Sequence, residues 1–430
     1  MNRVCLALPT NRACPATITA LHAEAAYAVR NFGADVQLLI LDSADARTRA
    51  AHADTVAALP PEPGVTVHHL DEERQRAWLR RTIARSGLPD PDRLLGLMLP
   101  PGVSYGACTN RAFLLAASLG CHSVHRRDSD STYQVHHGEP VFPVHHELPW
   151  LGRPAADATA TVTRTDLDPA LAHRPVALAG ASFIGELSVD IAEIRRLDEA
   201  VYHDVVGLWA PGDWPEDRRR ALVEESFTGA GTDPFTGDRS TLTVVDPMRV
   251  DMCNIAFDRA VYERVPLPPA TDTIGSDYFL LHLVHDAGLP GILHNRHIEN
   301  FHTPERRTDT GFPAYQRRFV KFLLSMLHFH HVYDRMTAEG AAGLLGPDHR
   351  VRPDRVARLV RESTTLDRTE NIWRLDRVDT AYRKLGGRYA RFADQLVLER
   401  EELLDQAARD MEDFAFLTEA WPSLTEAART

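Results

Sequence analysis

The sequence predicts an α/β fold in which a mixed sheet flanked by helices is followed by an α-helical C-terminal region. Three observations lead to this prediction. Strand-like and helix-like segments alternate over the first 135 residues, a weaker alternation continues to about residue 310, and helical periodicity dominates the remainder. Strands that alternate with helices of about 10–15 residues are typical of parallel βαβ units. We therefore expect three parts, residues 1–135, 136–310 and 311–430.

The first part shows the clearest elements. Residues 3–9 form an apolar run, and the helical segment after it starts with Pro15 and stops at Gly33, as helices often do. The further elements are a strand at 35–42, a helix to residue 59, a strand at 64–71, helices at 71–86 and 105–120, and a strand from residue 121 into the acidic loop RRDSDS. In such sheets ligands bind beyond the carboxyl ends of the strands.

The second and third parts are less regular at first and then strongly helical. Residues 135–175 are rich in Pro, His and Ala, which indicates a surface excursion. A strand with a Gly-Ala break precedes helices near 191–206, and residues 209–240 contain enough Gly, Pro and Asp for a mobile loop beside a site. After about residue 310, apolar residues recur three and four positions apart, which predicts amphipathic helices that pack on another layer.

Composition narrows the class of protein. The 430 residues carry 48 basic and 60 acidic side chains, and the net charge of -12 argues against general binding to nucleic acid or anionic membranes. The five cysteines lie far apart without a C-x-x-C pair, which fits reduced thiols. No apolar run approaches the roughly 20 residues of a membrane span, and the N-terminus lacks a signal-peptide pattern. We expect a cytoplasmic protein with small-molecule or protein partners.

The sharpest local signal is the acidic loop, in which Asp128 and Asp130 flank Ser129 at the end of a predicted strand. Two carboxylates at this spacing can face one cation, and oxygen ligands suit Mg²⁺ or Mn²⁺ better than zinc. A divalent ion there could stabilise a diphosphate leaving group. A lone D-x-D is a weak motif, so its position after the βαβ array carries the argument.

The order of these signals resembles a GT-A glycosyltransferase. In the N-terminal half the resemblance rests on the segments LALPTNR, LLILDS, CTNRAF and RRDSDS. In the second half, GSDYFLLHLVHDAGLPGILHNRHIENFH is similar to inverting members, in which a carboxylate opens a helix, a glycine ends it and a metal-binding histidine follows; Asp277, Gly288 and His302 fit this arrangement. The resemblance covers residues 3–303. It implies a Rossmann-like mixed sheet, similar to the family 2 and polypeptide N-acetylgalactosaminyltransferase-like group.

The resemblance also implies a role for each motif residue. The donor-binding residues would be Pro9, Thr10, Asn11, Arg12, Asp42, Asn110, Arg111, Arg127 and Asp128. Among them, Asp42 would hold the uracil or ribose edge, and Arg111 or Arg127 would neutralise phosphate. The metal ion, Mn²⁺ or Mg²⁺, would be held by Asp128, Asp130 and His302. Asp277 would be the general base that deprotonates the acceptor.

Several of these roles have alternatives. Ser276 stands where many relatives carry Glu, so Asp272 and Asp251 remain candidates for the base, and a retaining mechanism remains open. Structural roles compete as well: Asp42 and Asp277 as helix N-terminal carboxylates, Arg111 and Arg127 as ion-pair partners, and His294 or His297 in place of His302. The other histidines accompany no H-E-x-x-H motif or Cys pair, so a closed zinc site lacks its usual spacing.

The leading functional hypothesis is a metal-dependent glycosyltransferase, inverting in mechanism, that moves a sugar from a UDP-sugar or related donor to a soluble acceptor. A small-molecule or carrier-bound acceptor of natural-product, including antibiotic, biosynthesis would fit a chain without a membrane segment. A sugar-phosphate nucleotidyltransferase is the alternative enzyme, although LPTNRACP lacks the glycine and lysine that cradle a triphosphate. A non-catalytic scaffold that dimerises through its C-terminal helices is the third hypothesis; such helices could also form a homodimer of an enzyme.

Overall fold

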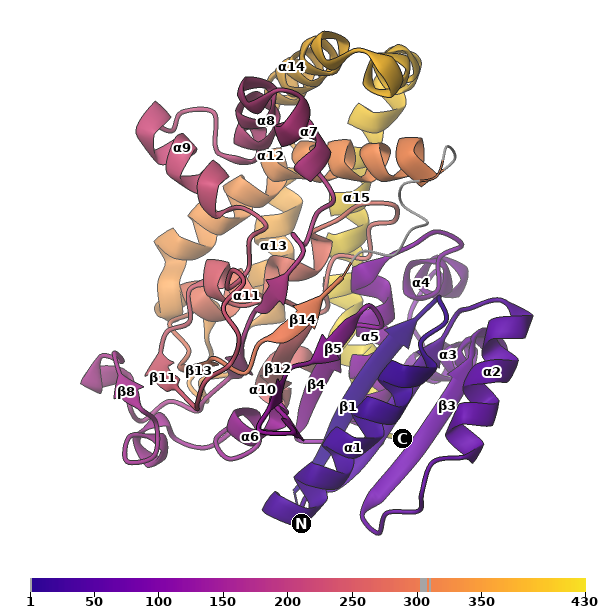
Figure 1. Ribbon diagram of the computed structural model, residues 1–430, viewed down its shortest axis with the longest axis vertical. Helices are drawn as coiled ribbons and strands as arrows, with labels where there is room; N and C mark the ends of the chain where they lie inside the picture. Colours follow the sequence, from indigo (N-terminus) through magenta and orange to yellow (C-terminus); the bar gives the residue numbers. More distant parts are fainter. Residues whose placement is uncertain (1, 302–307, 309–310) are drawn as a thin grey trace.

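The computed structural model describes residues 2–301, 308 and 311–430, and it is built around one nine-stranded sheet (Figure 1). The strand order is β3-β2-β1-β4-β12-β9-β13-β11-β8. The strands are β1 (Arg3–Thr10), β2 (Asp35–Asp42), β3 (Val65–Asp71), β4 (Ser123–Arg127), β8 (Arg164–Thr165), β9 (Leu178–Gly180), β11 (Ser240–Thr243), β12 (Asn254–Asp258) and β13 (Gly291–His294). The mixed α/β class with a helical C-terminal region is therefore confirmed.

The N-terminal half of the sheet is parallel, as predicted, because β1 pairs in parallel with both β2 and β4, and β2 with β3. Thr10 is the register partner of Asp42, so β1 and β2 end at the same edge. Alternate residues of β1 face opposite layers: Leu6 belongs to the core cluster of helix α1 (Pro15–Phe32), and Ala7 to that of helix α5 (Tyr105–Ser118). The period of two in strand side chains thus builds both helical layers.

The reversal of strand direction at β12 brings the segment before β12 next to the loop after β4. β12 runs antiparallel to β4, with Asn254 opposite Arg127, and β9 runs antiparallel to β12. An antiparallel strand begins where its neighbour ends, so residues 251–253 before β12 lie beside residues 128–130 after β4. A small second sheet has the order β10-β14-β5, and its strands are β10 (Phe183–Gly185), β14 (Ile298–Asn300) and β5 (Ser131–Tyr133). It adjoins residues 128–130 because β5 follows them directly in the chain.

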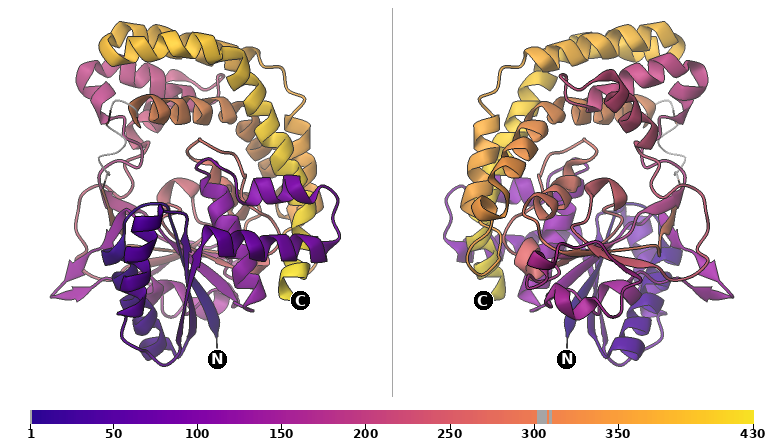
Figure 2. Two further views of the ribbon diagram at one scale, coloured as in Figure 1. Left: turned by 90° about the vertical axis from the view of Figure 1, so that its right-hand side faces the viewer. Right: turned by 90° about the vertical axis from the view of Figure 1, so that its left-hand side faces the viewer.

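Four helices form the C-terminal layer, as the periodicity predicts. They are α12 (Gly311–Leu344), α13 (Pro353–Ser363), α14 (Thr369–Leu385) and α15 (Gly387–Arg429). Figure 2 shows them arching over the sheet, with the end of α15 returning to the sheet layer. There α15 packs on α3 (Glu72–Ser86) and α5, and Trp421 donates its indole N–H to the carbonyl of Tyr262 at 3.0 Å. The layer is therefore continuous with the core of the sheet.

Two helices differ from expectation. Helix α4 (Pro91–Met98) follows α3 where no helix was expected, and α9 (Glu216–Glu225) lies within the segment expected to be a loop. The Gly, Pro and Asp residues on both sides of α9 obscured its helical signal, although Glu216 and Asp217 favour a helix N-terminus. The other short helices are α2 (Ala46–Ala57), α6 (Val144–Glu147), α7 (Ala192–Leu197), α8 (Glu199–Val206), α10 (Arg259–Tyr262) and α11 (Phe279–Asp286), and the remaining hairpin is β6 (Val135–His136) with β7 (Glu139–Pro140).

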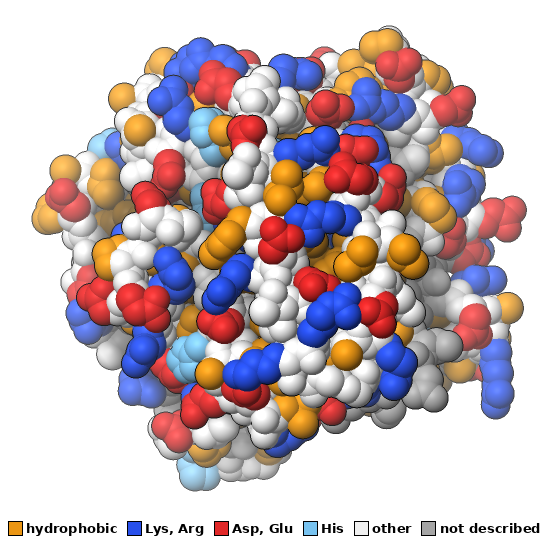
Figure 3. Space-filling view, turned by 90° about the horizontal axis from the view of Figure 1, so that it is seen from above, with side chains coloured by type: hydrophobic (Ala, Val, Ile, Leu, Met, Phe, Trp, Pro, Cys, Tyr) orange, Lys and Arg blue, Asp and Glu red, His pale blue; other side chains and the backbone are white. Residues whose placement is uncertain are grey.

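The surface above the helical layer mixes charges of both signs. Figure 3 shows acidic and basic side chains interspersed over this face, with hydrophobic side chains between them. Exposed ion pairs such as Arg361–Glu419 and Arg368–Asp405 belong to this layer. In the described part of the chain, no helix is both long enough and apolar enough to cross a membrane.

Candidate functional site

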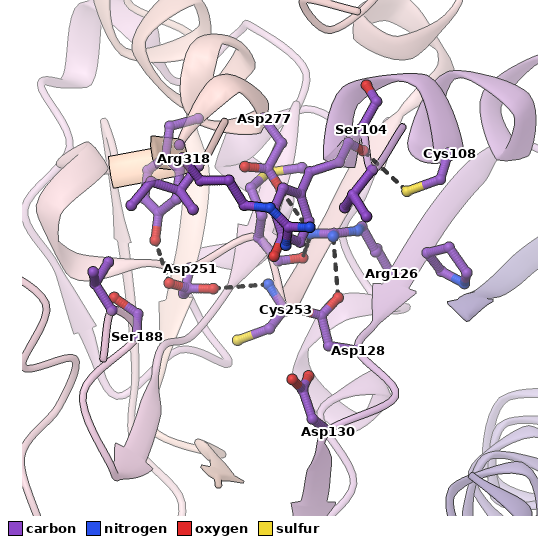
Figure 4. A pocket seen from close by; sticks show the side chains of 18 of the residues that line it. Ser104, Cys108, Arg126, Asp128, Asp130, Ser188, Asp251, Cys253, Asp277 and Arg318 are labelled. Atoms are coloured by element: carbon purple, nitrogen blue, oxygen red, sulfur yellow. Dashed lines mark hydrogen bonds and ion pairs between the residues drawn. The ribbon is translucent and has the colours of Figure 1, made fainter. Parts of the chain in front are cut away.

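A cavity of about 390 Å³ opens between the carboxyl edge of the parallel strands and the C-terminal helical layer. Its walls come from the loop after β1, the loop after β4, the segment before β12, the 3₁₀ turn η5 (Ser276–Tyr278) and helix α12. These segments are far apart in sequence, and the topology described above brings them together. Figure 4 shows Asp128, Asp130, Asp251 and Asp277 in this cavity, with the side chain of Arg126 among them.

Arg126 is the central cation of the cavity. Its guanidinium lies 3.0 Å from Asp128 and 3.2 Å from Asp277, and it donates to the carbonyl of Met252 at 2.6 Å. The residue is only 3% exposed, so these contacts replace water. Burial works against its charge, but Asp128 and Asp277 outweigh burial and raise its pKa. Arg126 thus stays charged and joins β4, the segment before β12 and η5.

The acidic loop is electrostatically strained. Burial raises the pKa of Asp128 to about 6, and the negative charges of Asp130 and Asp277 add to the effect while Arg126 opposes it. Asp130 forms an ion pair with Arg12 of the β1 loop at 2.6 Å. Each carboxylate of the D-x-D therefore faces an arginine. Asp251 and Asp277 add negative charge to the same cavity, and this excess favours a further cation.

Asp277 lies on a turn that requires a glycine. Gly275 precedes it with a φ of 71°, and a Cβ atom at Gly275 would lie 2.8 Å from the ring of Phe322. Burial raises the pKa of Asp277, and Arg126 opposes the rise. A carboxylate with a raised pKa is a better proton acceptor near neutral pH than an exposed one.

Asp251 lies beside Asp277 but has other partners. Its Oδ1 accepts from the backbone N–H of Cys253 at 2.9 Å, and its Oδ2 accepts a short hydrogen bond from the hydroxyl of Tyr278. Both oxygens are thus engaged in holding η5 to the segment before β12. This geometry favours Asp277 over Asp251 as the base. Asp272, the third candidate, adopts a φ of 50° and accepts from the backbone of Val103.

Most of the predicted site residues come together. The cavity is lined by Pro9, Thr10, Asn11, Arg12, Arg111, Asp128, Asp130 and Asp277. Thr10 shapes the β1 loop because its hydroxyl bonds to the backbone of Arg12. Arg111 has structural partners as well: it donates to Gln75 and to the carbonyl of Met98, each at 2.7 Å. His302 lies outside the described residues.

Asp42 does not line the cavity, although its neighbours Leu41 and Ser43 do. It is fully buried, its Oδ2 lies 2.8 Å from Nδ1 of His52 and 2.9 Å from Nε2 of His69, and its Oδ1 accepts from the N–H of Ala44. Burial raises its pKa, but the two histidines and Ala44 outweigh burial and lower it. The expected contact with a uracil or ribose therefore does not fit this placement; the carboxylate anchors the turn after β2.

Asn110 and Arg127 also point away from the cavity. The amide of Asn110 makes two hydrogen bonds with the backbone of Leu267 and so pins α5 to that segment. Arg127 is buried on the opposite face of β4, where it pairs with Glu24 at 2.8 Å and Glu147 at 2.9 Å. Both residues therefore have structural partners in place of the expected donor contacts.

Arg126 is the residue that the sequence reasoning missed. Successive side chains of a strand alternate between its faces, so the arginine that shares a face with Asp128 is Arg126, two positions earlier, and not Arg127. That signal was available in RRDSDS. Arg318 of α12 and Trp209 also line the cavity, but no local motif marks them because long-range packing brings them there.

The D-x-D fits a divalent ion by its chemistry. Asp128 and Asp130 offer carboxylate oxygens on the cavity wall, and Mg²⁺ is often held by one or two carboxylates together with phosphate oxygens and water. Among the described residues, sets of three closely spaced potential ligands occur at two places, neither of which includes the D-x-D: Asp42 with His52 and His69, and His145 with His146 and Asp238. Arg296 lies 2.6 Å from Asp238, so the second set already holds a positive charge.

Comparisons place the chain in a family and near a few solved structures. The model described as "Family of unknown function (DUF6271)" matches residues 2–430, so the chain belongs to that family. No curated protein matches the chain. Among solved structures, a mycobacterial protein is similar, with a TM-score of 0.37 and 18% identity over 76% of this chain and 74% of that one.

Two further solved structures are similar at lower identity. Mannosyltransferase PcManGT from Pyrobaculum calidifontis, in complex with GDP-Man and Mn²⁺, has a TM-score of 0.38 and 12% identity over 97% of this chain and 86% of that one. Core-mannan synthase A from Aspergillus fumigatus, in an Mn/GDP form, has a TM-score of 0.22 and 8% identity over 67% and 65%. All three TM-scores lie below 0.5, so these similarities do not identify a function for the chain.

Proposed function

We propose that this member of the family of unknown function is a metal-dependent GT-A glycosyltransferase that uses a nucleotide diphosphate sugar. The observation that carries the proposal is the convergence of Asp128, Asp130 and Asp277 with Arg12 and Arg126 in one cavity at the carboxyl edge of β1 and β4. Parallel sheets bind nucleotides at this edge. Paired carboxylates and arginines are the groups that a diphosphate needs for its metal ion and its charge.

The donor would lie over the loops after β1 and β4. Thr10, Asn11 and Ser43 offer polar groups to the nucleoside, and Arg12 and Arg111 offer positive charge to the diphosphate. Asp128 and Asp130 would hold the Mn²⁺ or Mg²⁺ ion. When bound, this ion supplies charge that stabilises the departing diphosphate.

Asp277 would act as the general base of an inverting displacement. The acceptor oxygen forms a bond to the anomeric carbon, the bond from that carbon to the diphosphate oxygen breaks with its electron pair, and the acceptor proton moves to Asp277. Arg126 positions Asp277 by its ion pair at 3.2 Å. Burial, which raises the pKa of Asp277, supports its role as a proton acceptor.

Incubation with Mn²⁺ and a panel of UDP- and GDP-sugars tests the function. We expect one donor to release its nucleoside diphosphate slowly to water, and faster with acceptor. An Asp277→Asn variant should bind that donor with unchanged affinity but lose about 10²–10⁴-fold in turnover. Release of pyrophosphate from a nucleoside triphosphate and a sugar phosphate would instead identify a nucleotidyltransferase. Absence of both donor binding and release across the panel would refute the proposal.

A further inference from the structure

We propose that the acceptor is a small, uncharged molecule whose nucleophilic hydroxyl is attached to an apolar ring system, and that Trp209, Phe227 and Phe322 form its binding wall. This inference rests on the proposed function, because it assigns the part of the same cavity that the donor leaves free. These three residues all line the cavity, and together they form the aromatic wall.

The cavity changes its chemistry along its length. The part formed by the β1 and β4 loops is polar and charged, with Thr10, Arg12 and Asp130. The part formed by helix α12 and the segments around α8 and α9 is apolar, and Val189, Trp209, Phe227, Phe322 and Met326 line it. In Figure 1 these segments lie in the helical layer, above the sheet edge that carries the acidic loop. A donor fills the first part, so the second part is left for the acceptor.

The aromatic wall is a preformed surface. The rings of Trp209 and Phe227 stack with centroids 5.3 Å apart and an interplanar angle of 17°, and Phe322 packs 5.8 Å from Trp209. The three residues come from the turn η3 (Gly207–Trp209), the loop after α9 and helix α12. Trp209 and Phe227 remain partly exposed, so ring faces are accessible from the cavity. Aromatic surfaces of this kind bind apolar rings by stacking.

Phe227 is held in a strained backbone conformation. Its φ of 65° lies in the left-handed region, where a bulky residue without a local hydrogen-bonding side chain is rare. Strain of this kind is kept where the surrounding structure enforces it, and it concentrates at functional sites. In this conformation the Phe227 ring stacks on Trp209. A binding role explains why a costly aromatic residue stands where glycine would fit the backbone better.

The wall adjoins the proposed base. Gly275 contacts the ring of Phe322 so closely that a Cβ atom would lie 2.8 Å from it, and Asp277 follows two positions later. A ring seated on the wall would therefore carry its hydroxyl toward Asp277. The charged residues of this part are balanced, because Glu225 faces Arg249 and Arg318 faces Asp272, each at 3.8 Å. The balance favours an uncharged acceptor.

Binding of 2-naphthol, measured by isothermal titration calorimetry on the full chain, tests the inference. We expect 2-naphthol to bind, and glucose, a polar alcohol, not to bind over the same concentration range. Phe227→Gly and Trp209→Leu should each weaken 2-naphthol binding about tenfold. Trp373→Leu, which removes an exposed tryptophan of α14, should leave it unchanged.

The Phe227→Gly variant removes the aromatic ring without disturbing the backbone conformation. Glycine adopts a φ of 65° without strain, so the variant should fold, as thermal unfolding can verify. Nucleoside diphosphate release in water is measured separately on the unaltered protein, so that release without any 2-naphthol binding would overturn this inference and leave the proposed function standing. Equal 2-naphthol affinity in the unaltered protein and both wall variants, or stronger binding of glucose, would overturn the inference.

Discussion

Removal of the guanidinium at the centre of the cavity should destabilise the fold in a pH-dependent manner. In Arg126→Leu, Asp128 and Asp277 lose a cation at 3.0 and 3.2 Å. At an effective dielectric constant of about 20, each contact is worth about 5 kcal/mol before desolvation is subtracted. Loss of one partner of a buried ionic cluster costs about 3–5 kcal/mol. We therefore expect the free energy of unfolding to fall by about 3–5 kcal/mol at pH 8.

The loss should be smaller at pH 5, because the carboxyl groups can then become neutral. The pKa of Asp128, already about 6 beside Arg126, rises further when that charge is removed. Urea unfolding at pH 8 and pH 5 measures both values. Arg164→Leu, which breaks the exposed pair with Asp166 at 2.7 Å, serves as the control and should cost less than about 1 kcal/mol. A loss below about 1 kcal/mol for Arg126→Leu, or an equal loss at both pH values, would refute the reasoning.

Two further substitutions test how the sheet and α5 are held. Burial raises the pKa of Asp258, the N-cap of α10, from 3.8 to about 6, so its ionised form costs stability above pH 6, and this cost vanishes below about pH 4. Asp258→Asn keeps the cap and should raise the free energy of unfolding by up to about 3 kcal/mol at pH 8, but not at pH 4. Urea unfolding measures both values, and an equal effect at the two pH values would contradict the proposed cost of the ionised carboxylate. Gly106→Ala in α5 would place a Cβ atom 1.9 Å from the carbonyl oxygen of Pro268, so it should lower the free energy of unfolding by about 1–3 kcal/mol. The control Gly96→Ala, with open space around the new Cβ atom, should not destabilise the protein. Equal thermal midpoints of the two variants would refute the packing argument.

The sequence predicts the parallel half of the sheet and the helical C-terminal layer because both depend on local periodicity. The D-x-D position follows from that periodicity too, since Asp128 comes directly after β4. Arg126 was accessible by the same rule, because a strand places residues two apart on one face. The placement of Asp42, in contrast, could not be predicted from local periodicity. Its buried contacts with His52 and His69 depend on how α2 and β3 pack beside β2, and a single sequence does not encode that packing in a readable motif.

The aromatic wall illustrates what local patterns cannot supply. Trp209 and Phe322 are more than one hundred positions apart, and they meet because the helical layer folds over the sheet edge. The left-handed conformation of Phe227 has no sequence signal, since glycine is the residue that such a position predicts. Long-range packing and backbone strain therefore account for the part of the site that sequence reasoning did not find.

Metal-dependent nucleotide binding tests the central claim most directly. Isothermal titration calorimetry with UDP and GDP, in Mn²⁺ and then in EDTA, compares the unaltered protein with Asp130→Asn. The control is Asp348→Asn, which removes an exposed carboxylate on the surface. We predict that one of the nucleotides binds in Mn²⁺, loses at least about tenfold in affinity in EDTA and in Asp130→Asn, and keeps its affinity in Asp348→Asn. Unchanged nucleotide affinity in EDTA and in Asp130→Asn, or no binding of either nucleotide, would contradict the assignment of this cavity.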